Sequence, residues 1–189
     1  LELLMVMLAG VSLPRPEYNK MMKDLIAALK ANGPRIKPKV RLLYTGGHAD
    51  NPEFFELLQQ NDAHVVSDNT GFGTRAADVL ICEDGDPLEA IINYYFEEKP
   101  AATRQMGTQV ERMERLLDLV KQYKADGVVA SRLYMCDLWA FEHFLMRKRL
   151  HENNVPFLEL EVDYTPEGQG QIKTRVQAFV ESLADRQTA

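Results

Sequence analysis

Short β-rich runs alternate with longer helical segments along this chain, and this alternation restricts its fold more than any other feature. The predicted strands cover residues 39–44, 64–67, 127–131 and 157–162. Helical patterns cover 18–31, 87–96, 108–124 and 172–183, and further helices start near Pro52 and Cys136. Short strands separated by helices imply crossover connections and a parallel sheet that is covered on both faces. We therefore predict an α/β fold, with a doubly wound, flavodoxin- or Rossmann-like parallel sheet of four strands in the order 2-1-3-4.

The two long helices on either side of the third strand carry apolar residues at helical spacing, which predicts the faces that they bury. Such a face packs against the sheet, and the opposite face meets solvent. The predicted buried residues are Val110, Met113, Leu117 and Val120 before the strand, and Leu138, Phe141 and Leu145 after it.

The chain has 189 residues, 46% of them apolar, which is enough for one substantial core and short for two. We expect residues 1–38 to be a helical lead-in from a preceding domain and residues 39–189 to form the α/β domain. Because the first residue is Leu rather than Met, we also expect the sequence to be part of a longer polypeptide.

Composition excludes several classes of function. A net charge of −6 without a basic stripe argues against binding to nucleic acid. The most apolar stretch, residues 1–13, is shorter than the roughly 20 residues that cross a bilayer, so no membrane partner is expected. Two widely separated cysteines suit reduced thiols, which favours a cytoplasmic protein. No HExxH or GxSxG motif occurs, so zinc and serine hydrolase chemistry is not supported.

In a sheet of this kind, ligands bind in the loops at the carboxyl ends of the strands, beside the point where the strand order reverses. The predicted loops at that edge are 45–51, 68–75, 132–137 and 163–171. Several of their glycines would let the backbone approach a ligand closely, but ordinary tight turns also use glycine. Both interpretations stay open, because no loop has a dinucleotide-binding fingerprint or the Lys-Ser/Thr of a phosphate-binding loop.

Cys136 is the most informative polar position, because it follows the third strand and opens the next helix. The positive end of a helix dipole favours the thiolate, which is both the nucleophilic and the metal-binding form of cysteine. The alternative is a small buried hydrophobic residue, as for most free cysteines. Cys82 continues the apolar run 79–81 without His or Cys at metal-binding spacing, so we predict a packing role for it.

Three segments, taken together in this order, are similar to a known family. They are Asp126-Gly-Val-Val followed by the lone Cys136, the run Pro-Phe-Leu-Glu-Leu-Glu-Val-Asp-Tyr over 156–164, and the ending Gln169-Gly-Gln171-Ile-Lys-Thr-Arg175. The chain resembles the 2-hydroxyacyl-CoA dehydratase and benzoyl-CoA reductase subunit family, which includes the 2-hydroxyglutaryl-CoA dehydratase D-component. The likeness extends over nearly the whole chain.

The resemblance implies the C-terminal domain of a larger subunit that acts on acyl-CoA thioesters by one-electron radical chemistry in anaerobic metabolism. It implies a [4Fe-4S] cluster held by three cysteines, of which Cys136 is the one that matches here. The isolated chain is then expected to hold no cluster and to be inactive. The implied partners are a homologous second subunit and an ATP-dependent iron–sulfur activator protein. Dehydratase (lyase) and aromatic acyl-CoA reductase (oxidoreductase) activities both stay open.

A pocket for the acyl-CoA is expected around Cys136. The thioester carbonyl gains negative charge on one-electron reduction, and N–H or guanidinium donors would stabilise that charge. The candidate binding residues are Gly46, Gly47, Gly73 and Arg75, and the candidate catalytic residues are Arg132 and Gln171.

A function of another class stays open as well, namely a non-catalytic α/β module that docks another subunit or an electron carrier. Exposed apolar groups on the outer helices would favour it. A receiver-type nucleotide domain is less well supported, because the first strand does not end in paired acidic residues.

Overall fold

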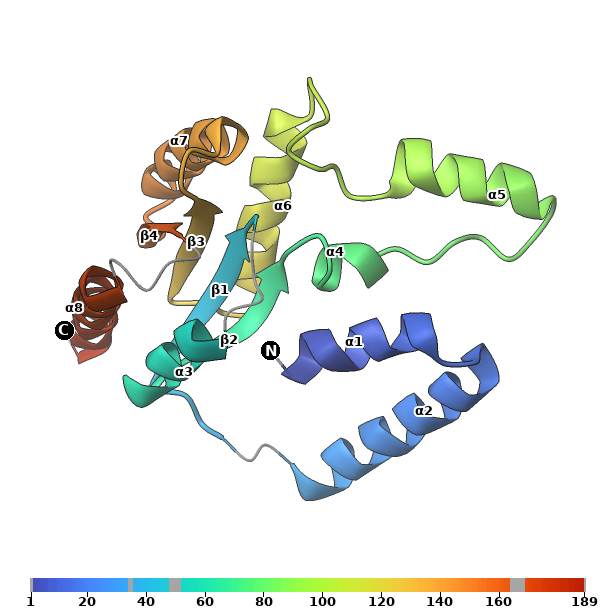
Figure 1. The fold of residues 1–189 in the computed structure, drawn as a ribbon, viewed down its shortest axis with the longest axis horizontal. Helices are drawn as coiled ribbons and strands as arrows, with labels where there is room; N and C mark the ends of the chain where they lie inside the picture. The colour runs from blue at the N-terminus through green and yellow to red at the C-terminus, as the bar shows by residue number, and fades with distance from the viewer. Residues whose placement is uncertain (1, 34–35, 48–51, 164–168, 189) are drawn as a thin grey trace.

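Four parallel strands form the sheet at the centre of the molecule (Figure 1). The computed structural model describes residues 2–33, 36–47, 52–163 and 169–188. Its strands are β1 (Val40–Gly46), β2 (Ala63–Asn69), β3 (Gly127–Leu133) and β4 (Phe157–Val162). All neighbouring strands are parallel, and their order is β2-β1-β3-β4. The predicted fold class and strand order are therefore confirmed, and the order reverses between β1 and β3.

Helices connect and surround these strands. The short α4 was not predicted, and the helix predicted over 87–96 is α5 followed by a π-helical turn, η1. The helices are α1 (Glu2–Ser12), α2 (Arg15–Asn32), α3 (Pro52–Gln60), α4 (Thr74–Ala77), α5 (Pro87–Asn93), η1 (Tyr94–Glu98), α6 (Gln109–Gln122), α7 (Asp137–Glu152) and α8 (Gln169–Thr188). Within the described ranges, none of them has the length and apolar character needed to cross a membrane.

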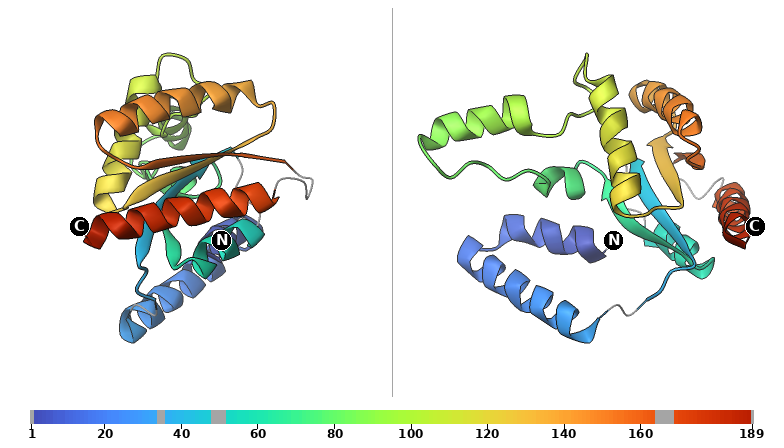
Figure 2. Two further views of the ribbon diagram at one scale, coloured as in Figure 1. Left: turned by 90° about the vertical axis from the view of Figure 1, so that its left-hand side faces the viewer. Right: turned by 180° about the vertical axis from the view of Figure 1, so that it is seen from behind.

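Helices α3 and α8 cover one face of the sheet, as the left panel of Figure 2 shows for α8. Alternate strand residues point to this face, because successive side chains of a strand lie on opposite sides. The core of this layer includes Leu42, Tyr44, Val129 and Leu160 from the strands, Phe55 and Leu58 from α3, and Val176, Val180 and Leu183 from α8.

Helices α6 and α7 cover the other face of the sheet. The core of this layer includes Leu43, Val128 and Ala130 from the strands, Met113, Leu116, Leu117 and Val120 from α6, and Met146 and Leu150 from α7. The central strands are thus buried on both sides, as expected for a parallel sheet between helices.

The predicted helix faces were wrong in part. Val110 on α6 is 72% exposed, and on α7 Leu138 and Phe141 are 39% and 58% exposed. Leu145 is partly buried and packs against the core. Helix α7 carries apolar residues on more than one side, so their spacing did not identify the side that meets the sheet. The buried stripe of α7 instead consists of Glu142, His143, Met146 and Leu150.

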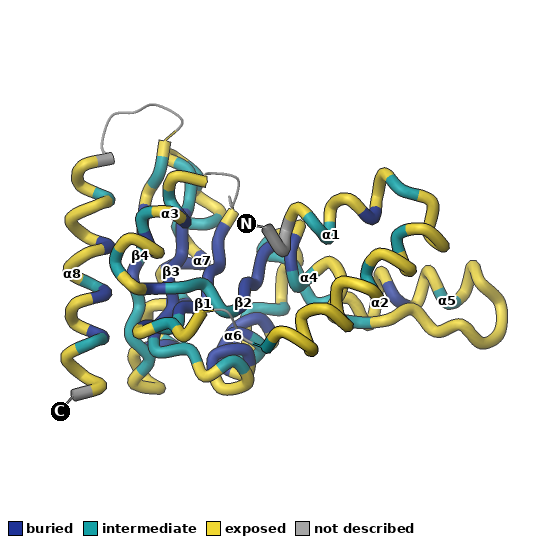
Figure 3. The backbone as a smooth tube through the Cα atoms, turned by 90° about the horizontal axis from the view of Figure 1, so that it is seen from below, coloured by how far each residue is buried: buried dark blue, intermediate teal, exposed yellow. Residues whose placement is uncertain are grey.

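Two parts of the chain lie away from the sheet. One is the pair of helices α1 and α2, and the other is a long excursion over residues 79–108, which we call the arm and which contains α5 and η1 (Figures 1 and 3). Helices thus do occur within 1–38, and the division of the chain into two domains stays a prediction. Cys82 lies in the arm and is exposed, so its predicted packing role was wrong. Its surroundings are an extended segment rather than a core strand.

Candidate functional site

The carboxyl ends of the parallel strands bring the predicted loops to one edge of the sheet. Gly47 follows β1, residues 70–73 follow β2, and residues 134–136 follow β3. Residues 48–51 and 164–168 of the other predicted loop segments lie outside the described residues. Because the strand order reverses between β1 and β3, this edge has the position at which open α/β sheets bind their ligands.

Cys136 is the residue from which α7 starts. Its backbone N–H donates to the carbonyl of Leu133 (3.1 Å), and its carbonyl accepts from the N–H of Ala140 (2.9 Å). The preceding residue, Met135, has a φ of 61°, which makes a tight turn between β3 and α7. The Cys136 side chain is half-buried and makes no capping hydrogen bond. The thiol is therefore held at a helix N-terminus by the backbone, with its sulfur uncommitted to the helix.

Gly46 and Gly47 are close to the chain itself. A Cβ on Gly46 would lie 2.2 Å from the carbonyl oxygen of Ser131, and one on Gly47 would lie 2.6 Å from Nε1 of Trp139. The N–H of Gly47 also donates to Ser131 O (3.2 Å). These contacts explain why both positions need glycine for packing, and a role in ligand binding stays a prediction.

Asp68 at the end of β2 fixes the loop that follows. Its buried carboxylate accepts hydrogen bonds from the N–H (2.9 Å) and hydroxyl (2.7 Å) of Thr70. It also accepts from the N–H (3.2 Å) and hydroxyl (2.8 Å) of Thr74. A Cβ on Gly73 would lie 2.0 Å from Asp68 Oδ1, so this loop can close only around glycine. The sequence shows Asp68 in the predicted loop, but its organising role becomes visible only in the structure.

Arg75 is half-buried on α4, just after this loop. A Cβ on Gly71 would lie 3.1 Å from its Nη2 atom, so the guanidinium lies against the loop backbone. Burial lowers the pKa of Arg75, and the nearby charges of Arg115 and Arg112 lower it further. The structure therefore places an arginine in a positive environment at the carboxyl end of β2.

Arg132 and Gln171, the predicted catalytic residues, are differently placed. The guanidinium of Arg132 is ion-paired with Glu161, and its Nε lies 3.7 Å from Oε1 of Glu159. Its side chain therefore meets carboxylates of β4. Gln171 is exposed in the first turn of α8. Their catalytic role stays a prediction.

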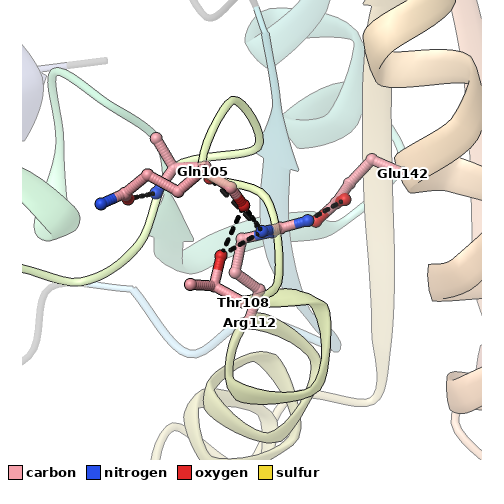
Figure 4. A network of polar contacts seen from close by, with 5 residues as sticks. Gln105, Thr108, Arg112 and Glu142 are labelled. Atoms are coloured by element: carbon pink, nitrogen blue, oxygen red, sulfur yellow. Dashed lines mark hydrogen bonds and ion pairs between the residues drawn. The ribbon is translucent and has the colours of Figure 1, made fainter.

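Sequence reasoning missed a buried ion pair between α6 and α7. Arg112 donates to both carboxylate oxygens of Glu142, from Nε (2.8 Å) and Nη2 (2.7 Å). Its Nη1 donates to the hydroxyl of Thr108 (2.6 Å) and the carbonyl of Gln105 (3.1 Å), as Figure 4 shows. The available signal was a pair of opposite charges on the apolar stripes of consecutive helices.

His143 lies fully buried next to Glu142 on α7. Its Nδ1 is 3.5 Å from Oε1 of Glu159, and its ring centroid lies 6.0 Å from that of Trp139 and 6.2 Å from that of Phe157. Burial lowers the pKa of His143, although the charge of Glu159 opposes this shift. The imidazole is therefore held in its neutral form.

The described residues do not form a complete metal site. No group of three His, Cys, Asp or Glu side chains within them is arranged to hold a metal ion. A [4Fe-4S] cluster is usually bound by several cysteine thiolates, and Cys136 fits the part of one such ligand. The second cysteine, Cys82, lies in the arm.

Comparison with known proteins decides the family. The family model described as 2-hydroxyglutaryl-CoA dehydratase, D-component, matches residues 1–183. The chain belongs to this family. The resemblance predicted from the sequence is therefore confirmed for nearly the whole chain.

Several relatives of this family member are curated subunits of enzymes. The chain is 29% identical over 156 residues to the putative dehydratase subunit YjiM of Escherichia coli, covering 80% of this chain and 39% of that protein. It is 24% identical to the (R)-phenyllactyl-CoA dehydratase beta subunit of Clostridium sporogenes, over 94% of this chain and 47% of that protein. It is 22% identical to a benzoyl-CoA reductase subunit of Thauera aromatica, over 95% and 47%. The chain thus spans less than half the length of these relatives.

Proposed function

We propose that this chain is the C-terminal domain of a subunit of a [4Fe-4S]-dependent enzyme that acts on acyl-CoA thioesters by one-electron chemistry. The parent enzyme would be a 2-hydroxyacyl-CoA dehydratase or an aromatic acyl-CoA reductase. The observation that carries the proposal is the position of Cys136, at the start of α7 and beyond the carboxyl end of β3, in a member of this family. A thiolate there faces the edge at which such sheets bind ligands.

Cys136 would serve as one ligand of the cluster, which supplies single electrons when it is bound. The helix N-terminus favours the thiolate form of a cysteine placed there. The remaining ligands are not found among the described residues, so no step of the reaction is assigned to the cluster here. What this chain contributes is the thiolate and the loops that surround it.

The loops at the edge would shape the pocket for the thioester. Gly46, Gly47 and Gly73 bring backbone close to the strand ends, and Arg75 supplies positive charge. Arg132 and Gln171 would donate to the thioester carbonyl oxygen as it gains negative charge. For Arg132 this requires its guanidinium to turn from Glu161 and Glu159 toward the edge.

The parent protein would work in a complex. Relatives are named beta subunits of (R)-phenyllactyl-CoA, lactoyl-CoA and (R)-2-hydroxyglutaryl-CoA dehydratases. By analogy, the partners would be a homologous second subunit and an ATP-dependent iron–sulfur activator that delivers electrons.

The two cysteines of the chain provide the test. In the full-length subunit, purified without oxygen together with its partner subunit, Cys136→Ser should remove the iron of this subunit and abolish turnover of the acyl-CoA. Cys82→Ser is the matched control, because Cys82 is exposed in the arm, and it should leave iron content and turnover unchanged. Iron analysis and electron paramagnetic resonance measure the first effect. Equal iron content in the two variants would refute the role of Cys136.

A second candidate function is a non-catalytic module that docks another subunit or an electron carrier. It is favoured by exposed apolar side chains on helices outside the sheet, including Met21 and Leu29 of α2 and Leu88, Ile91 and Phe96 of α5 and η1. Large exposed apolar surfaces on a soluble protein usually mark interaction sites. Assembly with the partner subunit, combined with unchanged iron content in Cys136→Ser, would support this function over the first.

A further inference from the structure

Three arginines come together at the carboxyl end of β2, between α4 and α6. Arg75 belongs to α4, and Arg112 and Arg115 belong to α6. The residue that ends α4, Asp78, is ion-paired with Arg115, which ties the two helices to each other. The charges of Arg112 and Arg115 act directly on Arg75.

Two of these arginines have acidic partners and one has none. Arg112 is bound to Glu142 and Arg115 to Asp78. No hydrogen bond or ion pair joins Arg75 to any other residue that the structure describes. Arg115 is also only partly satisfied, because its Nε and Nη2 atoms are buried and have no hydrogen-bond acceptor.

The acidic groups nearby are already engaged. The carboxylate of Asp68 accepts from two backbone N–H groups and two hydroxyls of the loop, and Glu142 holds the guanidinium of Arg112 on both oxygens. Their charges only partly oppose the effect of burial and of the other arginines on Arg75, whose pKa is lowered overall. The cluster is therefore short of negative charge at Arg75.

We propose that Arg75 binds a phosphoryl group of the coenzyme A part of the substrate, with Arg115 and Arg112 supplying further positive charge. The planar guanidinium fork matches the oxygens of a phosphate and donates two parallel hydrogen bonds to it. The loop of residues 70–73, fixed by Asp68, holds the approach to Arg75 open on the side of Gly71. This inference rests on the proposed function, because it takes the ligand to be an acyl-CoA.

The position of the cluster favours the phosphate end of the ligand over its acyl end. Arg75 follows β2 and Cys136 follows β3, with β1 between these strands, so their two loops start about 10 Å apart across the sheet. In coenzyme A, the pantetheine arm separates the phosphates from the sulfur. A single acyl-CoA lying along the edge could thus place its thioester near Cys136 and a phosphate at Arg75.

The test is a calorimetric titration of the 189-residue chain with coenzyme A, dephospho-coenzyme A, pantetheine and inorganic phosphate. Arg75→Gln should weaken coenzyme A binding by about tenfold or more, because it removes hydrogen bonds between charged groups. Pantetheine, which has no phosphate, should be unaffected by the substitution. Arg104→Gln is the matched control, since Arg104 is exposed in the arm and should leave all affinities unchanged. Dephospho-coenzyme A shows whether the 3′-phosphate or the pyrophosphate is the group bound.

Three outcomes would overturn the inference. They are unchanged coenzyme A affinity in folded Arg75→Gln, no coenzyme A binding to the unsubstituted chain, and inorganic phosphate binding as tightly as coenzyme A, which would indicate a site for free phosphate. If Arg75→Gln does not fold, as judged by circular dichroism, Arg75→Lys and Arg115→Gln replace it, with a several-fold loss of affinity expected in each. The proposed function fails separately, through unchanged iron content in Cys136→Ser.

Discussion

Arg112 on α6 and Glu142 on α7 form a two-pronged ion pair inside the protein, with N–O distances of 2.8 and 2.7 Å. Their side chains are only 7% and 3% exposed. Burial of two charges costs nearly as much free energy as their attraction returns, but a single charge left without its partner is strongly destabilising. The pair therefore makes each helix dependent on the other.

Replacement of one partner should cost far more stability than replacement of both. Glu142→Leu should lower the free energy of unfolding by about 3–5 kcal/mol, because Arg112 would stay buried without a counter-charge. The double variant Arg112→Met/Glu142→Leu should recover much of that loss. Urea denaturation followed by circular dichroism measures both. A double variant as unstable as the sum of the single variants would contradict this account.

Gly46 should tolerate no side chain. Its φ is 138°, and a Cβ would lie 2.2 Å from the carbonyl oxygen of Ser131, so Gly46→Ala should cost about 2 kcal/mol or more of stability. The control is Gly85→Ala, where φ is also positive (89°) but nothing lies within 4 Å of the added carbon. That variant should lose only about 1 kcal/mol. Equal losses in thermal unfolding would mean that the contact with Ser131 has no effect.

The stability of the fold should fall as the solution becomes mildly acidic. His143 has a lowered pKa in the folded state because it is buried, whereas the unfolded chain has the ordinary value of 6.5. Below that value the unfolded state binds the additional proton, so the free energy of unfolding decreases from about pH 7 downward. Its partner Glu159 also has a lowered pKa. Burial alone would raise it, but Arg147 and His143 outweigh burial, so its contribution is lost at more acidic pH.

His143→Gln tests this assignment, because glutamine does not titrate. The variant should show a flatter dependence of unfolding free energy on pH between about 7 and 5 than the unsubstituted chain. His64→Gln, on the partly buried edge strand β2, provides a matched control and should keep the original slope. The same slope in all three proteins would show that His143 is not the group responsible.

The 189-residue chain alone should hold no stoichiometric [4Fe-4S] cluster after anaerobic reconstitution. One thiolate at a helix start does not replace the several ligands that such a cluster needs. Iron and sulfide analysis with visible absorbance measures the content. A full cluster on each chain would show that the described residues are not the whole of the ligand set.

Arg132→Ala and Gln171→Ala, made in the intact complex, should each lower turnover by roughly 10²-fold, as the loss of a donor to a developing oxyanion does. Lys148→Ala on the exposed side of α7 is the control and should have no effect. Because Arg132→Ala also breaks contacts with Glu161 and Glu159, its thermal stability must be measured alongside. Unaltered turnover in stable variants would remove both residues from the pocket.

Sequence patterns predicted the sheet well because they depend on contacts that every strand makes. The β-rich runs are buried on both faces, and the helices between them leave little freedom in topology. The same patterns failed on α7, where Phe141 is exposed while Glu142 is buried. Burial of Glu142 depends on Arg112, thirty positions away in the sequence, and no local spacing encodes such a pair.

The candidate site shows a similar division. Cys136 lies at the helix start where the sequence placed it, because strand and helix boundaries are local features. The contacts of Gly46 with Ser131 and of Arg132 with Glu161 join distant segments, and they follow only from the register of neighbouring strands. The loop organised by Asp68 combines a local turn with a glycine whose necessity appears only in three dimensions.

The arm is attached to the domain at both of its ends. Asp78, just before it, is paired with Arg115, and Arg112 binds the carbonyls of Ala102 and Gln105 near its end. The cost of closing a loop rises only with the logarithm of its length, so an arm of another length or sequence would fit the same two anchors. Relatives could therefore exchange arms and acquire new neighbours in an assembly while the sheet, and the chemistry at its edge, evolve under separate constraints.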